Sequence, residues 1–521
     1  MRLPVLLRES LRGRRAQRGQ SLVLGSLSFL VLALMVTLSF NLSHALRQKM
    51  SLQQHSDALA YSMAVLEARA LNYYAVGNRA IAGSYVAMNS LHAYMAAASV
   101  TGAMLRASGD NFDQIALMEM GICAATRNPQ HCLHAKEAED IADDFRKEAR
   151  GYDGRVRRLE GGFRNAMSGL DLMVDNLHAA QRAVQDSTLQ ALTDGRSHGL
   201  EVLTQHNAPG ASFLPEAVGA LNANEFSCAV DGMPCQGSVQ DSSSKARARV
   251  MTEVANASRS GWPATRAMAS GGNGVQIPPH LHPDFLKKLQ DIPREGSVVV
   301  LEHKGTAKVV QHRSRVNSGG QSAGNEGGTV VASERGRLGH LWKDGFGESD
   351  YAVSVWSDRD GGGHQTGAAH SGAHSFEGVN AKALSTCAES GNCFMKFRAN
   401  PSASRDWGQP RVYSYVTRQF RGGDPKKTPW ELNPSGEVVL EHGPQGTGRL
   451  TLAPGEGVGL SKGLVYYHRF GPNGWREAPN LFSPYWRAKL HPFTPDEAAR
   501  VLKAAGNADA AELARVPGVS L

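Results

Sequence analysis

The feature that most constrains this chain is an uncharged run that begins at Gly19 and ends at Leu46. Its apolar part, from Leu22 to Leu42, is long enough as a helix to cross a hydrocarbon layer of roughly 30 Å. Six arginines and a single glutamate precede the run. Because short basic segments stay on the cytoplasmic side, we expect a single-pass membrane anchor with a cytoplasmic N-terminus and an exported remainder.

A cleaved signal peptide is the alternative interpretation of this segment. Ser43 and Ala45 place small residues at the positions that a signal peptidase prefers. The apolar run is longer than the roughly 7 to 15 residues of a signal-peptide apolar region, which favours a permanent anchor. We therefore expect residues 1–20 to form a basic cytoplasmic tip and residues 21–45 to contact the lipid bilayer of the inner (cytoplasmic) membrane. The bulk of the chain would be periplasmic.

The composition suits a folded, exported protein. A chain of 521 residues with 41% hydrophobic and 20% charged residues can bury a core and form more than one domain. The formal net charge of +8 includes the six arginines of the N-terminal tip, so it reports membrane topology first. No run interleaves basic and aromatic residues, and nucleic acid is not predicted as a partner.

The cysteines predict an oxidising compartment. The six of them form three pairs of near neighbours in sequence: Cys123 with Cys132, Cys228 with Cys235, and Cys387 with Cys393. The segments between them are rich in turn-forming residues, which favours three local disulfides over other connectivities. Free thiols or a zinc site are the alternatives, but none of the pairs has the C-x₂-C spacing of a zinc knuckle.

Residues 46–206 are predicted to form a long helical hairpin or coiled coil. The segment from Met50 to Leu105 contains no proline, so the membrane helix can continue outward through it. A break is expected between Gly109 and Cys132. Beyond it, apolar residues alternate steps of four and three from Phe145 to Val184, which is typical of a heptad seam. This seam suits packing within one chain, with pairing between chains as the alternative, and the Cys123 to Cys132 loop would form the turn.

The rest of the chain is predicted to be largely β structure, which makes the fold class α+β. We expect an irregular linker with short helices over residues 207–290, a mainly antiparallel β domain over residues 291–486, and a tail with a short helix, Pro495 to Ala505, over residues 487–521. The predicted strands are Ser297 to Leu301, Ala307 to Val310, Thr329 to Ser333, Tyr351 to Trp356, Val412 to Phe420, Val438 to Glu441, Leu450 to Leu452 and Leu464 to Phe470.

Candidate chemistry is sparse. His364, His370 and His374 lie in one glycine-rich loop, with His340 nearby in sequence, and imidazoles at such spacing can bind a metal. They lack a paired carboxylate or cysteine and the H-E-x-x-H spacing of a zinc helix, so neither a metal site nor a cofactor is predicted. No catalytic residue is predicted either. The alternative function is a membrane-anchored periplasmic enzyme, such as a metal-dependent hydrolase, with its site in the β domain.

A second motif carries a possible nucleophile. Residues 459–463 read Gly-Leu-Ser-Lys-Gly, which matches the G-x-S-x-G pattern of a nucleophile elbow. In that elbow a strand precedes the serine and a helix follows it. Here a loop-like segment precedes and a strand-like segment follows, so we expect a plain turn.

The residues on either side of the anchor resemble a known family. Arg18-Gly19-Gln20-Ser21-Leu22-Val23 precedes the apolar helix, and Gln53, Asp57 and several alanines follow it. This arrangement is similar to the start of the TadE/TadG-like proteins of the tight-adherence (Flp) pilus assembly system. The resemblance covers about residues 14–90. It implies a bitopic envelope protein of a pilus or secretion assembly. Because such a role also accounts for the anchor, the heptads and the disulfides, we expect a non-enzymatic structural or assembly component with protein partners in the envelope.

One position departs from the pilin pattern. Leu24 stands where pilin-like relatives carry the glutamate implicated in peptidase recognition and subunit registration. This departure puts processing after Gly19 in doubt. TadG-like members keep an uncleaved membrane helix, and the resemblance to them implies the same for this chain.

Overall fold

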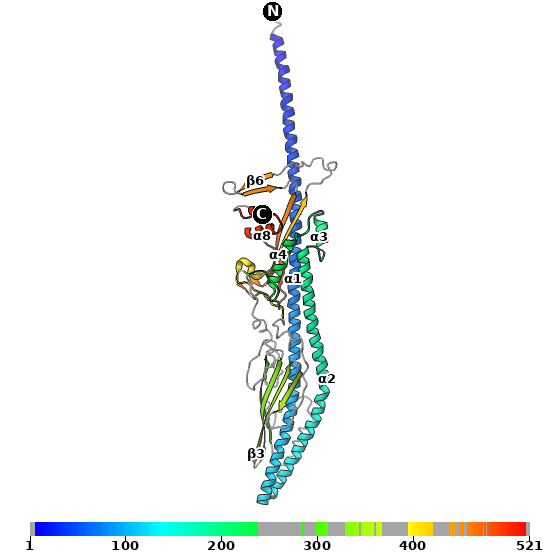
Figure 1. The fold of residues 1–521 in the computed structure, drawn as a ribbon, viewed down its shortest axis with the longest axis vertical. Coiled ribbons are helices and arrows are strands. Elements are labelled where there is room, and N and C mark those ends of the chain that lie inside the picture. Colours follow the sequence, from blue (N-terminus) through cyan, green and yellow to red (C-terminus); the bar gives the residue numbers. More distant parts are fainter. Residues whose placement is uncertain are drawn as a thin grey trace, which may run out of the picture.

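The computed structural model describes residues 6–237, 284, 298–310, 329–342, 345–358, 361–366, 394–419, 438–442, 448–452, 456–471, 474–475 and 477–516. Within these residues the molecule is elongated and mostly helical (Figure 1). The N-terminal end of one very long helix projects alone from a group of shorter helices and strands, which we call the head. Beyond the head the long helix continues beside a second helix to a distal turn, and we call this pair the hairpin.

Helix α1, Leu6–Thr126, is a single helix of 121 residues. It continues through Gly109 and ends at Thr126, so the break expected between Gly109 and Cys132 lies near the end of that range. A Cβ at Gly109 would lie 3.2 Å from Cγ of Arg146, so the missing side chain lets a partner helix approach closely. Around this point Leu105, Phe112 and Ile115 are buried against the partner, which stabilises the helix where its own propensity is low.

Helix α2, Pro129–Asp194, runs back along α1 and completes the predicted antiparallel hairpin. The turn lies where the sequence placed it, between Cys123 and Cys132, which form a disulfide. Arg127 adopts a left-handed backbone conformation with φ of 56° and ends α1. The side chain of Asn128 then accepts a hydrogen bond from the backbone N–H of Gln130 at 3.1 Å and caps the start of α2.

The contact face of α2 only partly follows the predicted heptad seam. Phe145 and Phe163 are buried as predicted, whereas Ala166 and Met173 are exposed. In the second half of the helix the buried positions lie one residue later: Met167, Val174, Gln181 and Thr188. A straight α-helix drifts by ~20° per heptad relative to a 3.5-residue repeat. Over several heptads the contact face therefore moves by about one residue.

The head is built around α1. A three-stranded antiparallel sheet, in the order β11 (Trp486–Leu490), β8 (Glu456–Tyr467), β5 (Arg411–Gln419), contacts this helix with all three strands. Helices α3 (Leu200–Asn207), α4 (Glu216–Ala229), α8 (Pro495–Ala504) and α9 (Ala508–Leu513) complete it, and α8 matches the predicted C-terminal helix. The shared core includes Leu59, Met63, Leu71, Phe226, Val412, Val416, Val465, Trp486 and Val501.

The other strands form separate antiparallel sheets. Strands β1 (Val298–Val310), β2 (Thr329–Trp342), β3 (Gly345–Asp358) and β4 (Gly361–Thr366) form a four-stranded meander beside the hairpin (Figure 1). Two short pairs are β6 (Val438–His442) with β7 (Gly448–Leu452), and β9 (Phe470–Gly471) with β10 (Gly474–Trp475). A 3₁₀ segment, Ala403–Gly408, precedes β5.

Candidate functional site

The projecting part of α1 contains one segment that is apolar enough to span a membrane, Leu22–Phe40. Its mean hydropathy is 2.3, and none of it is buried against the described residues. A large apolar surface left uncovered by protein is unusual for a soluble molecule and suits contact with lipid. The segment belongs to the same unbroken helix as the core of the head, so the apolar span and the head are joined without a linker.

Polar side chains fix α1 where it first meets the head. The Gln53 amide donates to the carbonyl of Leu460 at 2.8 Å and accepts from the N–H of Leu460 at 3.3 Å. Ser461 Oγ donates to Asp57 Oδ1 at 2.5 Å, and Gln53 donates to the same carboxylate oxygen at 3.0 Å. Lys49 donates to the carbonyl of Val458. The turns of α1 that follow the apolar segment are thus hydrogen bonded to Val458, Leu460 and Ser461 of β8.

The G-x-S-x-G motif lies inside β8 and not in a turn, so the predicted turn is wrong. A Cβ at Gly459 would lie 2.9 Å from the carbonyl oxygen of Leu52, and a Cβ at Gly463 would lie 2.9 Å from that of Ala60. Alternate residues of a strand share one face, so both glycines and Ser461 face α1. The motif lets the helix backbone lie directly against the strand, and it is a packing feature.

The pair of hydrogen bonds between the Gln53 side-chain amide and the backbone of Leu460 recurs with other residues. In these pairs an asparagine of a helix meets a strand or loop of the head. In each pair the side-chain amide donates to a backbone carbonyl and accepts from the N–H of the same residue, as a neighbouring strand would. N···O distances are 2.7 to 3.1 Å in these pairs: Asn72 with Trp486, Asn78 with Met395, and Asn222 with Tyr413. These hydrogen bonds satisfy buried backbone groups and set the register of the helices against the head.

A buried charge network joins α8 to the sheet. The Glu497 carboxylate lies 2.7 Å from Nζ of Lys462 and 2.6 Å from Nη1 of Arg411, and Arg411 also contacts Asp406 at 2.6 Å. Burial by itself would raise the pKa of Glu497, but the hydrogen bond from Lys462, the backbone N–H of Thr494 and the two cationic charges lower it overall. Glu497 is therefore ionised in the fold and balances two buried cations.

Two buried side chains in α1 differ from Glu497 because they lack hydrogen-bond partners among the described residues. Glu67 is fully buried, and neither of its carboxylate oxygens has a hydrogen-bond partner among the described residues. Burial, with a contribution from the charge of Glu225, raises the pKa of Glu67 well above its ordinary value. His55 is also buried without a ring partner among the described residues, and burial lowers its pKa. Burial therefore favours the neutral form of both side chains.

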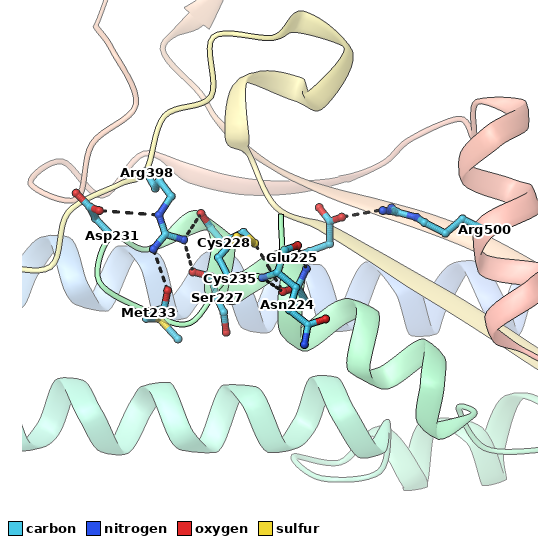
Figure 2. Close-up of a disulfide and its surroundings, with 10 residues drawn as sticks. Asn224, Glu225, Ser227, Cys228, Asp231, Met233, Cys235, Arg398 and Arg500 are labelled. Carbon is cyan, nitrogen blue, oxygen red and sulfur yellow. Dashed lines mark hydrogen bonds and ion pairs between the residues drawn. A yellow bond between two sulfur atoms is a disulfide. The ribbon is translucent and has the colours of Figure 1, made fainter. Parts of the chain in front are cut away.

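The second disulfide closes a loop next to α4 (Figure 2). Cys228 and Cys235 are bonded as predicted. Arg398, from the segment before β5, fills the loop and donates at 2.9 to 3.2 Å to three backbone carbonyls, those of Ser227, Cys228 and Met233. Its guanidinium also lies 3.9 Å from Asp231. The loop is therefore held by one cation in addition to its disulfide.

The predicted histidine cluster is only partly within the described residues. His364 lies in β4 opposite Val355, and His340 lies in β2 opposite Gly347. His370 and His374 lie outside the described residues, so the structure does not test these candidates, at which no metal site was predicted. Cys387 and Cys393 also lie outside the described residues, and the third disulfide stays a prediction.

A different group in the described part of the chain could hold a metal, and sequence reasoning missed it. Glu119, His131 and His134 each offer one ligand atom, and these atoms lie within 4.8 Å of one another at the turn of the hairpin. The only sequence signal is a pair of histidines three residues apart immediately after the turn. Comparisons of the chain with models of protein families, with curated proteins and with solved structures found no match.

Proposed function

We propose that this protein is a single-pass, membrane-anchored structural component of a pilus or secretion-type envelope assembly, of the TadE/TadG-like kind, without enzymatic activity. The observation that carries the proposal is the continuity of α1. One helix supplies the apolar span and then becomes the central element of the head and half of the hairpin. A chain built in this way holds its exported parts at a fixed position relative to the membrane.

The length of the helix supports a spacer role. At about 1.5 Å per residue, the part of α1 between Phe40 and Thr126 extends about 130 Å. An isolated helix of this length would bend and fray, but α2 packs along its distal part and the sheet of the head packs along its proximal part. This packing keeps α1 extended and thus holds the distal turn far from the membrane.

The proposed orientation places the N-terminus in the cytoplasm and the head and hairpin in the periplasm, with the anchor in the inner membrane. The arginines before Gly19 support this orientation because basic flanks are retained inside. The disulfides at Cys123 and at Cys228 support it as well, since such bonds persist in oxidising compartments.

The distal turn is the proposed contact surface for protein partners. Large apolar side chains are exposed there on both helices: Leu117 at 75%, Met118 at 58%, Met120 at 53% and Leu133 at 46%. Methionine and leucine are flexible side chains that adapt to a partner surface, and an exposed group of them is typical of a protein-binding region. The lipid bilayer, contacted through residues 21–45, is the second proposed partner.

Photo-crosslinking in living cells tests the proposal. A photoreactive amino acid at Leu117 should give discrete crosslinked products, and mass spectrometry should identify exported envelope proteins in them. The same amino acid at Arg158, an exposed position in the middle of α2, is the matched control and should give far less product. Products formed only with cytoplasmic proteins, or equal and diffuse products from both positions, would contradict the proposal.

A further inference from the structure

We propose that the distal turn of the hairpin binds a Zn²⁺ ion through Glu119, His131 and His134. Glu119 lies near the end of α1, and the two histidines lie in the first turns of α2. Oε2 of Glu119 is 2.7 Å from Nδ1 of His131 and 3.8 Å from Nδ1 of His134. This inference concerns a site that the proposed structural role does not require.

The spacing of these atoms fits a tetrahedral metal. With Zn–N and Zn–O bonds of about 2.0 to 2.2 Å, neighbouring ligand atoms in a tetrahedral site lie about 3.3 Å apart. The two distances to Glu119 lie on either side of this value. Changes of about half an ångström in each bring Glu119 to the tetrahedral distance from both histidines. The ligand atoms of the two histidines lie within 4.8 Å of each other and would also have to approach by side-chain rotation to surround one ion.

The chain holds these ligands in place before any metal binds. The disulfide between Cys123 and Cys132 ties α1 to α2 at the same level, and His131 is the residue next to Cys132. The cap formed by Asn128 and the proline at the first position of α2 fix where that helix begins. Little conformational entropy remains to be lost on binding, which favours affinity.

A metal ion at this position would compensate the charge of the buried Glu119 carboxylate. Glu119 and His134 are buried, and His131 is half-buried. A carboxylate removed from water is costly unless a positive charge or hydrogen bonds compensate it. In the metal-free protein the hydrogen bond with His131 supplies part of this compensation. A divalent cation bound by both imidazoles and the carboxylate supplies it directly.

The donor set indicates the class of metal and the kind of site. Two imidazoles and one carboxylate suit Zn²⁺ among the common divalent ions, and three protein ligands leave one tetrahedral position open. That position would take water or a donor atom from outside the chain. Zinc would then link the ends of α1 and α2 and present an exchangeable coordination position at the tip of the molecule.

The test uses the full-length protein in detergent, stripped with a chelator and then titrated with ZnCl₂ alone. Bound zinc is measured by mass spectrometry after gel filtration, and we expect one ion per chain. Glu119→Gln and the double variant His131→Asn/His134→Asn should weaken binding by more than about 100-fold, because even residues that only orient metal ligands contribute 10- to 100-fold. Circular dichroism establishes that each variant keeps its helical content.

Two controls separate this site from other histidines. His206→Asn changes an exposed histidine of α3 and should keep full zinc binding. The double variant His370→Asn/His374→Asn removes the loop candidates and should also keep it. The proposal would be overturned if the wild-type protein bound no stoichiometric zinc. It would also be overturned if Glu119→Gln and the His131→Asn/His134→Asn variant both retained zinc, or if zinc were lost only in the His370→Asn/His374→Asn variant.

Discussion

Replacing Gly463 with alanine is expected to destabilise the head by about 1 to 3 kcal/mol, although alanine is intrinsically the better strand residue. The added Cβ would lie 2.9 Å from the carbonyl oxygen of Ala60 and 3.0 Å from Cβ of Ala64. Both atoms belong to the well-packed part of α1 and cannot move aside independently. Strand β8 cannot withdraw either, since β5 and β11 pair with it on both edges. Valine at this position should cost more than alanine.

Chemical unfolding followed by circular dichroism measures this effect. Gly83→Ala is the matched control, because a Cβ at Gly83 meets nothing within 4 Å. That change should stabilise α1 by up to about 1 kcal/mol, since alanine is favoured over glycine in a helix. The two identical substitutions should therefore have opposite signs. Equal effects of Gly463→Ala and Gly83→Ala would show that β8 does not lie against α1 as described.

The second large effect is expected for Glu497→Gln, which should cost about 3 to 5 kcal/mol. The side chains of Lys462 and Arg411 are almost completely buried, and Glu497 contacts both. Removing one partner of a buried ion pair leaves an uncompensated charge, which is far more costly than losing an exposed pair. Glu139→Gln on the exposed side of α2 is the control and should change stability by less than about 0.5 kcal/mol.

The pH dependence of this variant gives an independent measurement. The pKa of Glu497 is lower in the folded state than in the unfolded state. Its contribution to stability is therefore fully present above the ordinary glutamate pKa of about 4.3 and is lost as the pH falls through the lowered folded-state value. Between neutral pH and about pH 3, the wild-type protein should lose more stability than Glu497→Gln. Parallel pH profiles for the two proteins would contradict the ionised network.

Local patterns in the sequence were sufficient to predict the helical hairpin. The apolar run, the absence of proline between Met50 and Leu105 and the heptad spacing after Phe145 all indicate helices, and the first cysteine pair marks the turn. The exact face of α2 that contacts α1 was harder to predict, because a small mismatch between 3.5 and 3.6 residues per turn accumulates along α2. Burial therefore moved from Ala166 to Met167 and from Met173 to Val174.

The packing of the head could not be predicted from local sequence patterns. Glycine and serine at residues 459–463 are typical of a turn, yet their small size is what allows α1 to lie on β8. The partner residues, such as Ala60, are about 400 positions away in sequence. The amide pairs and the ligand group of Glu119, His131 and His134 likewise form only when distant segments or two helices meet. Apart from the spacing of His131 and His134, the sequence contains no local signal for such contacts.

The central claim is that the apolar segment Leu22–Phe40 and the head share one uninterrupted helix. It can be tested by pulsed electron paramagnetic resonance on the full-length protein in lipid nanodiscs. Nitroxide labels carried by non-natural amino acids at Phe40 and Val76, both exposed, spare the native cysteines. Because the two positions are ten helical turns apart, a continuous helix predicts a narrow distance distribution centred at about 54 Å. A broad distribution with a clearly shorter mean would show a break between anchor and head and would contradict the account.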